Sequence, residues 1–362
     1  MTPTLAPIEA VSQRVERFAD DRRREADGLG AEAVAFVASA AAALTGGKRL
    51  RARFCLTGWQ AVAESAGAPA APAEAAIAAA AALEIFHAAA LVHDDLIDNS
   101  DLRRGRPSAH RAWETSHRDA GWAGDAGAFG RSAAVLLGDL LVAWSDDLLE
   151  EGLRGAAHAD AARTAYAVMR RDVTIGQFLD VAEEAAHVTA PDGEHAARAL
   201  RVASLKSARY SVEQPLLIGA AIAGADAAQR DALSRFGHPI GLAFQLRDDV
   251  LGVFGDSAVT GKPSGDDLRE GKRTLLVAYA REGMDAATRA RFDAELGDPG
   301  LDDGAVARLQ TAIVDTGALA RVETHIDDYE REAEAALDGA DLGAEATATL
   351  RALARAAISR TS

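Results

Sequence analysis

The sequence predicts an all-α protein. Apolar residues make up 49% of its 362 residues, much of this alanine, and aromatic residues make up only 5%. Small side chains at that frequency favour close-packed helices. Apolar and charged residues recur at helical spacing, whereas β-branched and aromatic residues alternating at period two are hard to find.

The expected elements follow from this spacing and from the residues that interrupt it. One helix is expected over residues 8–27 and a second is expected to end near residue 44. Further helices are expected to begin near residues 48, 74 and 132, the one from 74 running into the aspartates near 94. Others are expected around residues 174–180 and 206–209 and over 236–256, with two to four more to residue 362. Loops are expected at 28–30, 66–72, 189–194, 261–267 and 297–304, and a mobile connection at 116–130, where Gly, Pro, Ala or short polar residues gather.

The stretch from Leu83 to Ser108 joins an apolar helix to aspartates and then to arginines. Asp94 and Asp98 lie one helical turn apart, so their carboxylates share a face and repel each other unless a cation lies between them. Mg²⁺ takes one or two carboxylates together with water and phosphate oxygens. The stretch predicts a metal and diphosphate site, against the alternative that aspartate-rich helix ends are more often solvated surface.

A second apolar helix runs into the paired aspartates Asp248 and Asp249, with Gln245 one turn before them. A glycine-rich loop follows, and Lys272 stands near the start of the next helix. Two such sites can hold Mg²⁺ ions on one diphosphate and neutralise the charge of a departing diphosphate. The apolar helix faces beneath would shelter the resulting carbocation.

Basic residues that could bind a second anion precede the first aspartates. Lys48 and Arg51 follow two glycines at an expected helix start, where basic side chains oppose the helix dipole unless an anion is bound. His87 shares the predicted helix face of Asp94. It is either a core histidine or a ligand of a second diphosphate.

These motifs resemble those of the trans-isoprenyl diphosphate synthases, the polyprenyl synthetase family, and most closely its geranylgeranyl diphosphate synthases. In the family's order they are GGKRLR (46–51), HDDLIDNSDLRRGRPSAH (93–110), GQFLD (176–180), KSARY (206–210), FQLRDDVLGVFGD (244–256) and GKPSGDDLREGKRT (261–274). The resemblance implies one polyprenyl synthetase domain over residues 1–362, with its motif core at 46–274 and C-terminal helices at 275–362. The implied fold is an isoprenoid-synthase helical bundle around a deep central cavity, usually a homodimer.

The implied activity is that of a prenyltransferase, which condenses isopentenyl diphosphate with an allylic diphosphate. The allylic diphosphate ionises, the isopentenyl double bond attacks, and a proton is lost, with three Mg²⁺ ions expected when the allylic substrate is bound. The expected product is geranylgeranyl diphosphate, and farnesyl or a longer polyprenyl diphosphate is the alternative.

The resemblance assigns roles residue by residue. The Mg²⁺ ligands would be Asp94, Asp98 and Asp248, with Asp95 and Asp249 in support. The allylic diphosphate would be held by Arg103, Lys206, Lys262 and Lys272. Isopentenyl diphosphate would be held by Lys48, Arg51, His87 and Arg104. Oxygen dipoles near the allylic cation would come from Ser207 and Gln245.

Product length is expected to depend on the helix beneath Asp94. Ala89 and Ala90 leave the path for a hydrocarbon tail open. Phe86 lies about 12 Å from Asp94 along the helix axis and is predicted to be the floor of this path. The alternative is an ordinary core phenylalanine that faces another helix.

The sequence departs from the family's pattern at two positions that matter. Gly252 replaces the last aspartate of the second motif, so one carboxylate is missing there, and Ala52 stands where proline commonly follows GGKRxR. A terpene cyclase and a non-catalytic synthase subunit are the competing interpretations. The cyclase is disfavoured because its longer second motif is not matched, and the subunit because the acids and bases are retained.

Bulk properties limit the partners and the compartment. The formal charge of −16 argues against nucleic acid as a partner. The single cysteine, Cys55, excludes an intrachain disulfide and is expected in the core. The N-terminus lacks a signal-peptide pattern, and the apolar run 75–92 is interpreted as a buried helix and not a transmembrane segment. We expect a cytoplasmic protein.

Overall fold

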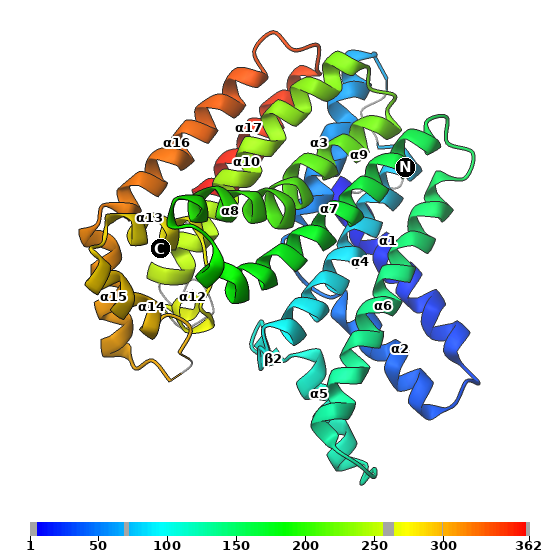
Figure 1. Cartoon of the computed structure of the whole chain (residues 1–362). Coiled ribbons are helices and arrows are strands. Elements are labelled where there is room, and N and C mark those ends of the chain that lie inside the picture. The colour runs from blue at the N-terminus through cyan, green and yellow to red at the C-terminus, as the bar shows by residue number, and fades with distance from the viewer. Residues whose placement is uncertain (1–5, 69–71, 256–263, 299, 360–362) are drawn as a thin grey trace.

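The computed structural model describes residues 6–68, 72–255, 264–298 and 300–359. It is built almost entirely from helices (Figure 1), which confirms the all-α prediction. The described residues also contain a short antiparallel hairpin, in which β1 (Leu102–Arg103) pairs with β2 (Arg106–Pro107).

The helices follow one another with short connections. The first group is α1 (Pro7–Ala26), α2 (Ala31–Ala43), α3 (Leu50–Ser65), α4 (Glu74–Ile97), α5 (Ala109–Asp119), α6 (Ala126–Leu153) and α7 (Ala159–Ala186). The middle group is η1 (His187–Thr189), η2 (Asp192–Glu194), α8 (His195–Val202), the π-helical segment η3 (Ala203–Glu213) and α9 (Gln214–Ile222). The last group is α10 (Ala227–Phe254), α12 (Asp266–Glu270), α13 (Leu275–Gly283), α14 (Ala286–Glu295), α15 (Asp303–Asp315), α16 (Ala318–Ala336) and α17 (Ala344–Ile358).

Side-chain caps fix the starts of the two long helices α6 and α10. Asp226 accepts the backbone N–H of Gln229, and the Gln229 side chain accepts the N–H of Asp226, which forms a capping box at the start of α10. Asp125 accepts the N–H of Ala128 at the start of α6. These bonds satisfy backbone donors that a helix cannot pair internally.

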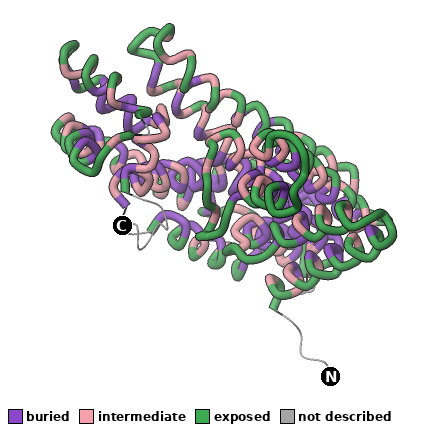
Figure 2. The backbone as a smooth tube through the Cα atoms, turned by 90° about the horizontal axis from the view of Figure 1, so that it is seen from below, coloured by how far each residue is buried: buried purple, intermediate pink, exposed green. Residues whose placement is uncertain are grey.

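Two apolar clusters hold the bundle together, and α3 contributes to both. Cys55 packs with α1, α4, α6 and α7, whereas Phe54 packs with α9, α10, α13 and α16. Figure 2 shows buried residues running along the inner sides of the helices and exposed residues along the outer sides. The prediction that Cys55 is a core residue is confirmed, and burial, with the charge of Glu84, raises the pKa of its thiol to about 12.

Small residues bring helices close together, as the composition suggested. A Cβ atom at Gly58 on α3 would overlap the carbonyl oxygen of Leu216, and one at Gly219 on α9 would overlap that of Cys55. Neither position has room for a side chain, so α3 and α9 are in backbone contact.

Two expectations, one about a connection and one about the C-terminal helices, are wrong. Residues 116–130 form no mobile connection, because α5 continues to Asp119 and α6 begins at Ala126. The reason is an aromatic cluster in which Phe129 packs against Trp113, His117 and Trp122 at centroid distances of 5.1–6.2 Å. The described C-terminal part contains α13 to α17, more than the two to four helices expected, because helices of only a few turns show too few apolar repeats to be separated by spacing.

Among the described residues, α4 and α6 are long and apolar enough to span a membrane by length and composition alone. The most apolar part of α4 is 72% buried, which confirms the interpretation of residues 75–92 as a buried helix. The corresponding part of α6 is only 33% buried.

Candidate active site

A cavity of about 1010 Å³ lies among α4, α7, η3 and α10. The loop before α3, the β hairpin and the segment from α12 to α13 complete its wall. Its apolar lining includes Ala88, Leu91, Val173, Ala199, Val202, Phe244 and Leu251. The volume and mixed lining are typical of a small-molecule site.

Most of the residues predicted for the site lie on this cavity. Those in its wall are Lys48, Arg51, His87, Ala90, Asp94, Arg103, Arg104, Lys206, Ser207, Gln245, Asp248, Asp249 and Lys272. The predicted residues that the described lining does not include are Phe86, Ala89, Asp95 and Asp98. Lys262 lies outside the described residues.

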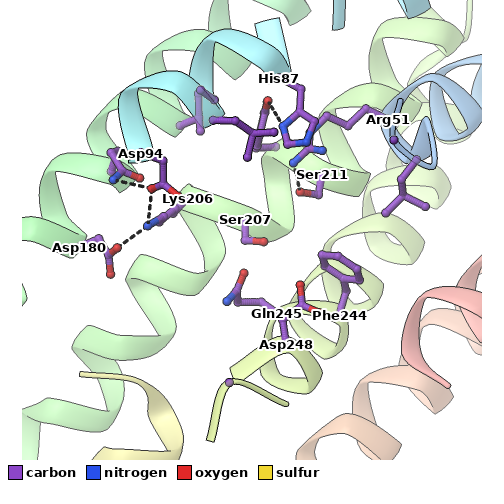
Figure 3. Close-up of a pocket in the computed structure, with 18 of the residues that line it drawn as sticks. Arg51, His87, Asp94, Asp180, Lys206, Ser207, Ser211, Phe244, Gln245 and Asp248 are labelled. Atoms are coloured by element: carbon purple, nitrogen blue, oxygen red, sulfur yellow. Dashed lines mark hydrogen bonds and ion pairs between the residues drawn. The ribbon is translucent and has the colours of Figure 1, made fainter. Parts of the chain in front are cut away.

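Asp94, in the last turn of α4, is held by two partners from across the cavity. Its Oδ1 accepts the Gln177 amide N–H at 3.1 Å and lies 3.4 Å from the Lys206 ammonium, which also pairs with Asp180 (Figure 3). Burial alone would raise the pKa of Asp94, but the charges of Lys206, Lys272 and Arg103 outweigh it and lower the pKa. Asp94 therefore stays ionised beside a lysine.

The two other aspartates of this motif have different surroundings. Asp98 is the C-terminal cap of α4, and burial and the charge of Asp94 raise its pKa to about 7. Asp95 is not among the described lining residues and is buried, and its Oδ1 accepts the Nε–H of Arg103 at 2.8 Å. Asp95 thus orients Arg103, whose side chain reaches the cavity wall.

The second aspartate pair lies on α10, across the cavity from α4. Asp249 is buried and accepts the Gln245 amide N–H at 2.7 Å. Burial raises the pKa of Asp249 to about 8, and the charge of Asp267 adds to the effect. In Figure 3, Ser207 and Gln245 lie between Asp94 and Asp248.

Lys272 is the second partly buried cation of this region. Its Nζ lies 2.7 Å from Glu270 and 3.6 Å from Asp267. Although burial opposes its charge, Asp267, Glu270 and Asp98 hold the pKa of Lys272 well above its ordinary value. The charges of Lys272 and of Asp98 in the first acidic motif stabilise each other, and the charge of Lys272 also acts against the raised pKa of Asp249 in the second motif.

The opposite end of the cavity is basic and is anchored by Glu84. The buried Oε1 of Glu84 accepts the Ala52 N–H at 3.0 Å, and its Oε2 lies 3.5 Å from Arg49. Since α3 begins at Leu50 and Arg49 has φ 52°, Lys48 precedes the helix, and the prediction of a helix start at Lys48 is wrong. Glu84 satisfies a donor in the first turn of α3 and fixes the loop onto α4.

Arg104 from the hairpin closes over the double glycine of this loop. Its Nη1 donates to the carbonyl oxygen of Thr45 at 3.3 Å. Gly47 has φ 90°, and a Cβ atom there would lie 3.2 Å from Nη2 of Arg104. The glycines therefore provide both the backbone conformation and the space for the arginine.

Arg51, His87 and Tyr210 form one packed group in the wall. The Arg51 guanidinium donates to Ser211 Oγ at 2.8 Å and lies 4.1 Å above the Tyr210 ring. The Tyr210 hydroxyl lies 3.4 Å from Nδ1 of His87. Burial, and then the charges of Arg51, Arg104, Arg103 and Arg49, hold the pKa of His87 well below its ordinary value, so its imidazole is neutral.

Several wall residues were missed in the sequence. Glu84 lies three residues before His87 on the same predicted helix, but the sequence indicates no partner for it, and Tyr210 lies in the KSARY motif, where the resemblance assigns it no role. The π-helical segment η3 presents Lys206, Ser207, Tyr210 and Ser211 to one cavity. Residues 206 and 210, like 207 and 211, are four residues apart, so helical spacing was a signal that could have grouped Tyr210 and Ser211 with Lys206 and Ser207.

The donor set of the cavity fits Mg²⁺. Among the described residues no three carboxylate, imidazole or thiol groups converge into a complete protein-only metal site. Asp94 and Asp248 nevertheless present hard oxygen donors to one cavity. Mg²⁺ commonly takes only one or two protein carboxylates and fills its shell with water and phosphate oxygens.

Comparison with known proteins agrees with this geometry. The sequence pattern of the polyprenyl synthetase family matches residues 35–313. The chain belongs to the polyprenyl synthetase family. The match contains every motif from Gly46 to Thr274, and the family resemblance predicted from the sequence is confirmed.

The relatives within the polyprenyl synthetase family are named for products of different length. A geranylgeranyl pyrophosphate synthase structure from Corynebacterium glutamicum, complexed with isoprenyl diphosphate and magnesium, is 38% identical, with TM-score 0.90 and 98% coverage of both chains. The geranylgeranyl diphosphate synthase of Mycobacterium tuberculosis is 39% identical over 58% of this chain and 53% of its own length. The geranylfarnesyl diphosphate synthase of Aeropyrum pernix is 36% identical over 65% of this chain and 66% of its own. The matches therefore span between about half and two thirds of these curated relatives.

Replacing Glu84 should destabilise the protein by more than the loss of side-chain volume alone would. Glu84→Ala leaves the Ala52 N–H without its acceptor and Arg49 without its carboxylate, so we expect a loss of about 3 kcal/mol in the free energy of unfolding. Urea denaturation measures this loss. Glu84→Gln should lose less because it keeps the acceptor, and the exposed Glu16→Ala is the control. Equal unfolding midpoints for Glu84→Ala and Glu16→Ala would contradict the prediction.

Proposed function

We propose that the chain is a prenyltransferase that condenses isopentenyl diphosphate with an allylic diphosphate. The single observation that carries this proposal is one cavity with carboxylates on both α4 and α10, with Lys206 in the wall between them, and with a separate basic end. Such a cavity suits two diphosphates of different roles. One would be bound through metal ions, and the other would be bound directly by basic side chains.

The acidic end would hold the allylic diphosphate. Mg²⁺ on Asp94, Asp98 and Asp248 would supply Lewis-acid stabilisation of the departing diphosphate. Lys206, Lys272 and Arg103 add positive charge from the protein, and all three line the cavity. Gln245 donates its N–H to Asp249, which orients its carbonyl group beside Ser207 and the developing carbocation.

The basic end would hold isopentenyl diphosphate. Arg51, Lys48 and Arg104 line it, and the neutral His87 can donate one further hydrogen bond. The apolar residues between the two ends would cover the isopentenyl double bond and exclude water. The isopentenyl double bond would be the nucleophile and the final proton would pass to the released diphosphate, so neither a protein nucleophile nor a protein base is needed.

The decisive assay uses purified full-length protein, Mg²⁺, isopentenyl diphosphate and each allylic diphosphate in turn. We expect elongated prenyl diphosphates, and no product when EDTA removes the metal. Asp94→Asn should reduce the rate about 100-fold or more because it removes transition-state charge stabilisation. Asp231→Asn, an exposed carboxylate on α10, is the control. Cyclic hydrocarbon would identify a terpene cyclase instead, and an absence of turnover would favour a non-catalytic subunit.

We infer that the product is geranylgeranyl diphosphate. Ala90 lines the cavity one turn before Asp94, so a small side chain stands where the tail of the allylic substrate would pass. Phe86 packs behind the wall, with its ring centroid 5.8 Å from that of Tyr210 and 6.4 Å from that of Tyr166. The role of Phe86 as a floor stays a prediction, because the described lining includes Tyr210, which Phe86 contacts, but not Phe86 itself.

Ala90→Phe should shorten the products. The added ring would occupy the path of the tail next to Asp94, so farnesyl or geranyl diphosphate should replace most of the longer product. Chromatography of dephosphorylated products measures the distribution. Ala90→Ser keeps the small side chain and is the matched control. Phe86→Ala tests the floor directly, and an unchanged distribution would place the floor at another residue.

We also infer that the protein is a homodimer that uses α6. This helix exposes Val135 and Leu136, with 44% and 60% of their surfaces accessible, between the exposed polar residues Arg131, Ser132 and Asp139. A second copy of the same face would cover these side chains.

Leu136→Glu should convert the dimer to a monomer. A charged side chain at the centre of an apolar contact remains unpaired and opposes association. Light scattering after size-exclusion chromatography measures the mass. Val314→Glu changes an exposed apolar residue on α15 and should leave the dimer intact. A wild-type chain that elutes as a monomer at micromolar concentration would contradict the inference.

A further inference from the structure

The π-helical segment η3 has polar residues outside the cavity as well as in its wall. Four of its side chains line the cavity, but Ser204, Arg209 and Glu213 are not among the described lining residues. π-Helices are rare and mostly last a single turn, so a segment of 11 residues needs other contacts to stabilise it. The polar residues outside the lining are candidates for this role.

The sequence interrupts α-helical hydrogen bonding at the end of η3. Pro215 is the second residue of α9, which follows η3 directly, and proline has no N–H to donate to the carbonyl oxygen of Ser211. The N–H of Gln214 donates to the carbonyl oxygen of Arg209, five residues earlier, as in a π-helix. Because a π turn holds more residues than an α turn, a change to α geometry within η3 would rotate Lys206 relative to α9.

Glycines on two helices let the backbone of η3 lie close to both. A Cβ atom at Gly176 on α7 would lie 2.4 Å from the backbone nitrogen of Lys206. One at Gly241 on α10 would lie 2.4 Å from the carbonyl oxygen of Ala208. Backbone atoms cannot turn aside as the end of a side chain can. The backbone on both sides of Ser207 is therefore confined between α7 and α10.

Arg209 joins η3 to α7 through a buried carboxylate. Asp172, one turn before Gly176 on α7, is buried, and its Oδ2 accepts the Nη1–H of Arg209 at 2.9 Å. Its Oδ1 accepts the Nε–H of Arg171 at 2.8 Å, a bond within α7. Of these two arginines, only Arg209 connects Asp172 to another element.

Glu213 and Ser204 join η3 to α10. Glu213 is buried, and its Oε1 accepts the hydroxyl O–H of Ser234 at 2.6 Å. Its Oε2 lies 3.8 Å from Nε of Arg209, so this guanidinium lies between two buried carboxylates. Near the start of η3, the Ser204 hydroxyl lies 2.8 Å from Nε2 of His238. Polar contacts therefore cross from α7 to α10 along this side of η3.

We propose that Arg209 is a positioning residue for prenyl transfer, which holds η3 through Asp172 and Glu213 so that Lys206 and Ser207 face the allylic diphosphate. The proposal rests on the proposed function, which places that diphosphate beside Lys206. Asp172, Arg209 and Glu213 are all outside the described cavity lining. They would act through the geometry of η3 and not by contact with a substrate.

The test compares Arg209→Gln with Arg171→Gln in the full-length protein. Each variant removes one guanidinium from Asp172, but Arg171 lies on α7 with Asp172 and has 63% of its side chain exposed, so it is the matched control. Arg209→Lys keeps the positive charge. Hydrogen–deuterium exchange of the backbone over residues 203–213 measures how firmly η3 is held, and this readout needs no turnover.

Arg209→Gln should accelerate exchange over residues 203–213 about 10-fold or more, whereas Arg171→Gln should change it less than about twofold. The kcat of elongation should fall about 10- to 100-fold in Arg209→Gln, because misplaced catalytic groups lower the rate steeply. The KM for isopentenyl diphosphate should stay within about threefold, since Lys48 and Arg104 come from other elements. Arg209→Lys should keep at least about a third of the wild-type kcat.

Three results would overturn the proposal. One is wild-type exchange over residues 203–213 in Arg209→Gln, and another is faster exchange with unchanged kcat. The third is an equal loss of kcat in Arg171→Gln and Arg209→Gln, which would assign Asp172 to the stability of α7 alone. Should Arg209→Gln fail to fold, Ser234→Ala removes only the hydroxyl bound to Glu213 and should change exchange and kcat in the same direction.

Failure of the proposed function would look different. A wild-type chain that makes no prenyl diphosphate would contradict that function and the role of Arg209 in prenyl transfer. The exchange rates of Arg209→Gln and Arg171→Gln would still decide whether Arg209 holds η3.

Discussion

The site depends on two partly buried lysines that pair with carboxylates which would otherwise repel one another. Asp94 on α4 and the aspartates of α10 face a common cavity, and Lys206 and Lys272 lie among them. In a partly buried region, each unpaired charge would carry a large desolvation penalty. Opposite charges on neighbouring helices therefore fix the distance between α4, η3 and α12, and they leave a cavity where close packing would otherwise fill the space.

The fold could be predicted from the sequence because its signals are local. Helical spacing and glycine interruptions locate α1, α2, α4 and α10, and the acidic and basic motifs identify most of the cavity wall. The failures have physical causes. Packing of Phe129 with the aromatic residues around it orders a segment whose own composition is that of a loop. Glu84 anchors the start of α3 through Ala52 and Arg49, and because these partners are distant in the sequence, local spacing does not predict this role.

The positions of the site residues were harder to predict than their identities. Spacing along α4 correctly groups His87, Ala90 and Asp94 on the cavity, but it also included Phe86, which packs against tyrosines from α7 and η3. The left-handed Arg49 moves Lys48 out of the helix. The carboxylate of Asp267 on α12 lies beside Gly252 on α10, a contact that spacing along α10 does not predict. A motif read along one helix cannot reveal a group supplied by another.

Tyr210 connects two parts of the cavity that would otherwise be independent. Its ring carries the Arg51 guanidinium on one face and contacts Phe86 at its edge, and its hydroxyl meets His87. A substitution that gives the hydrocarbon tail more room by moving this ring would also remove the surface on which Arg51 rests. Selection for longer products would then act on acceptor affinity as well, so evolution at this wall is expected to change both properties together.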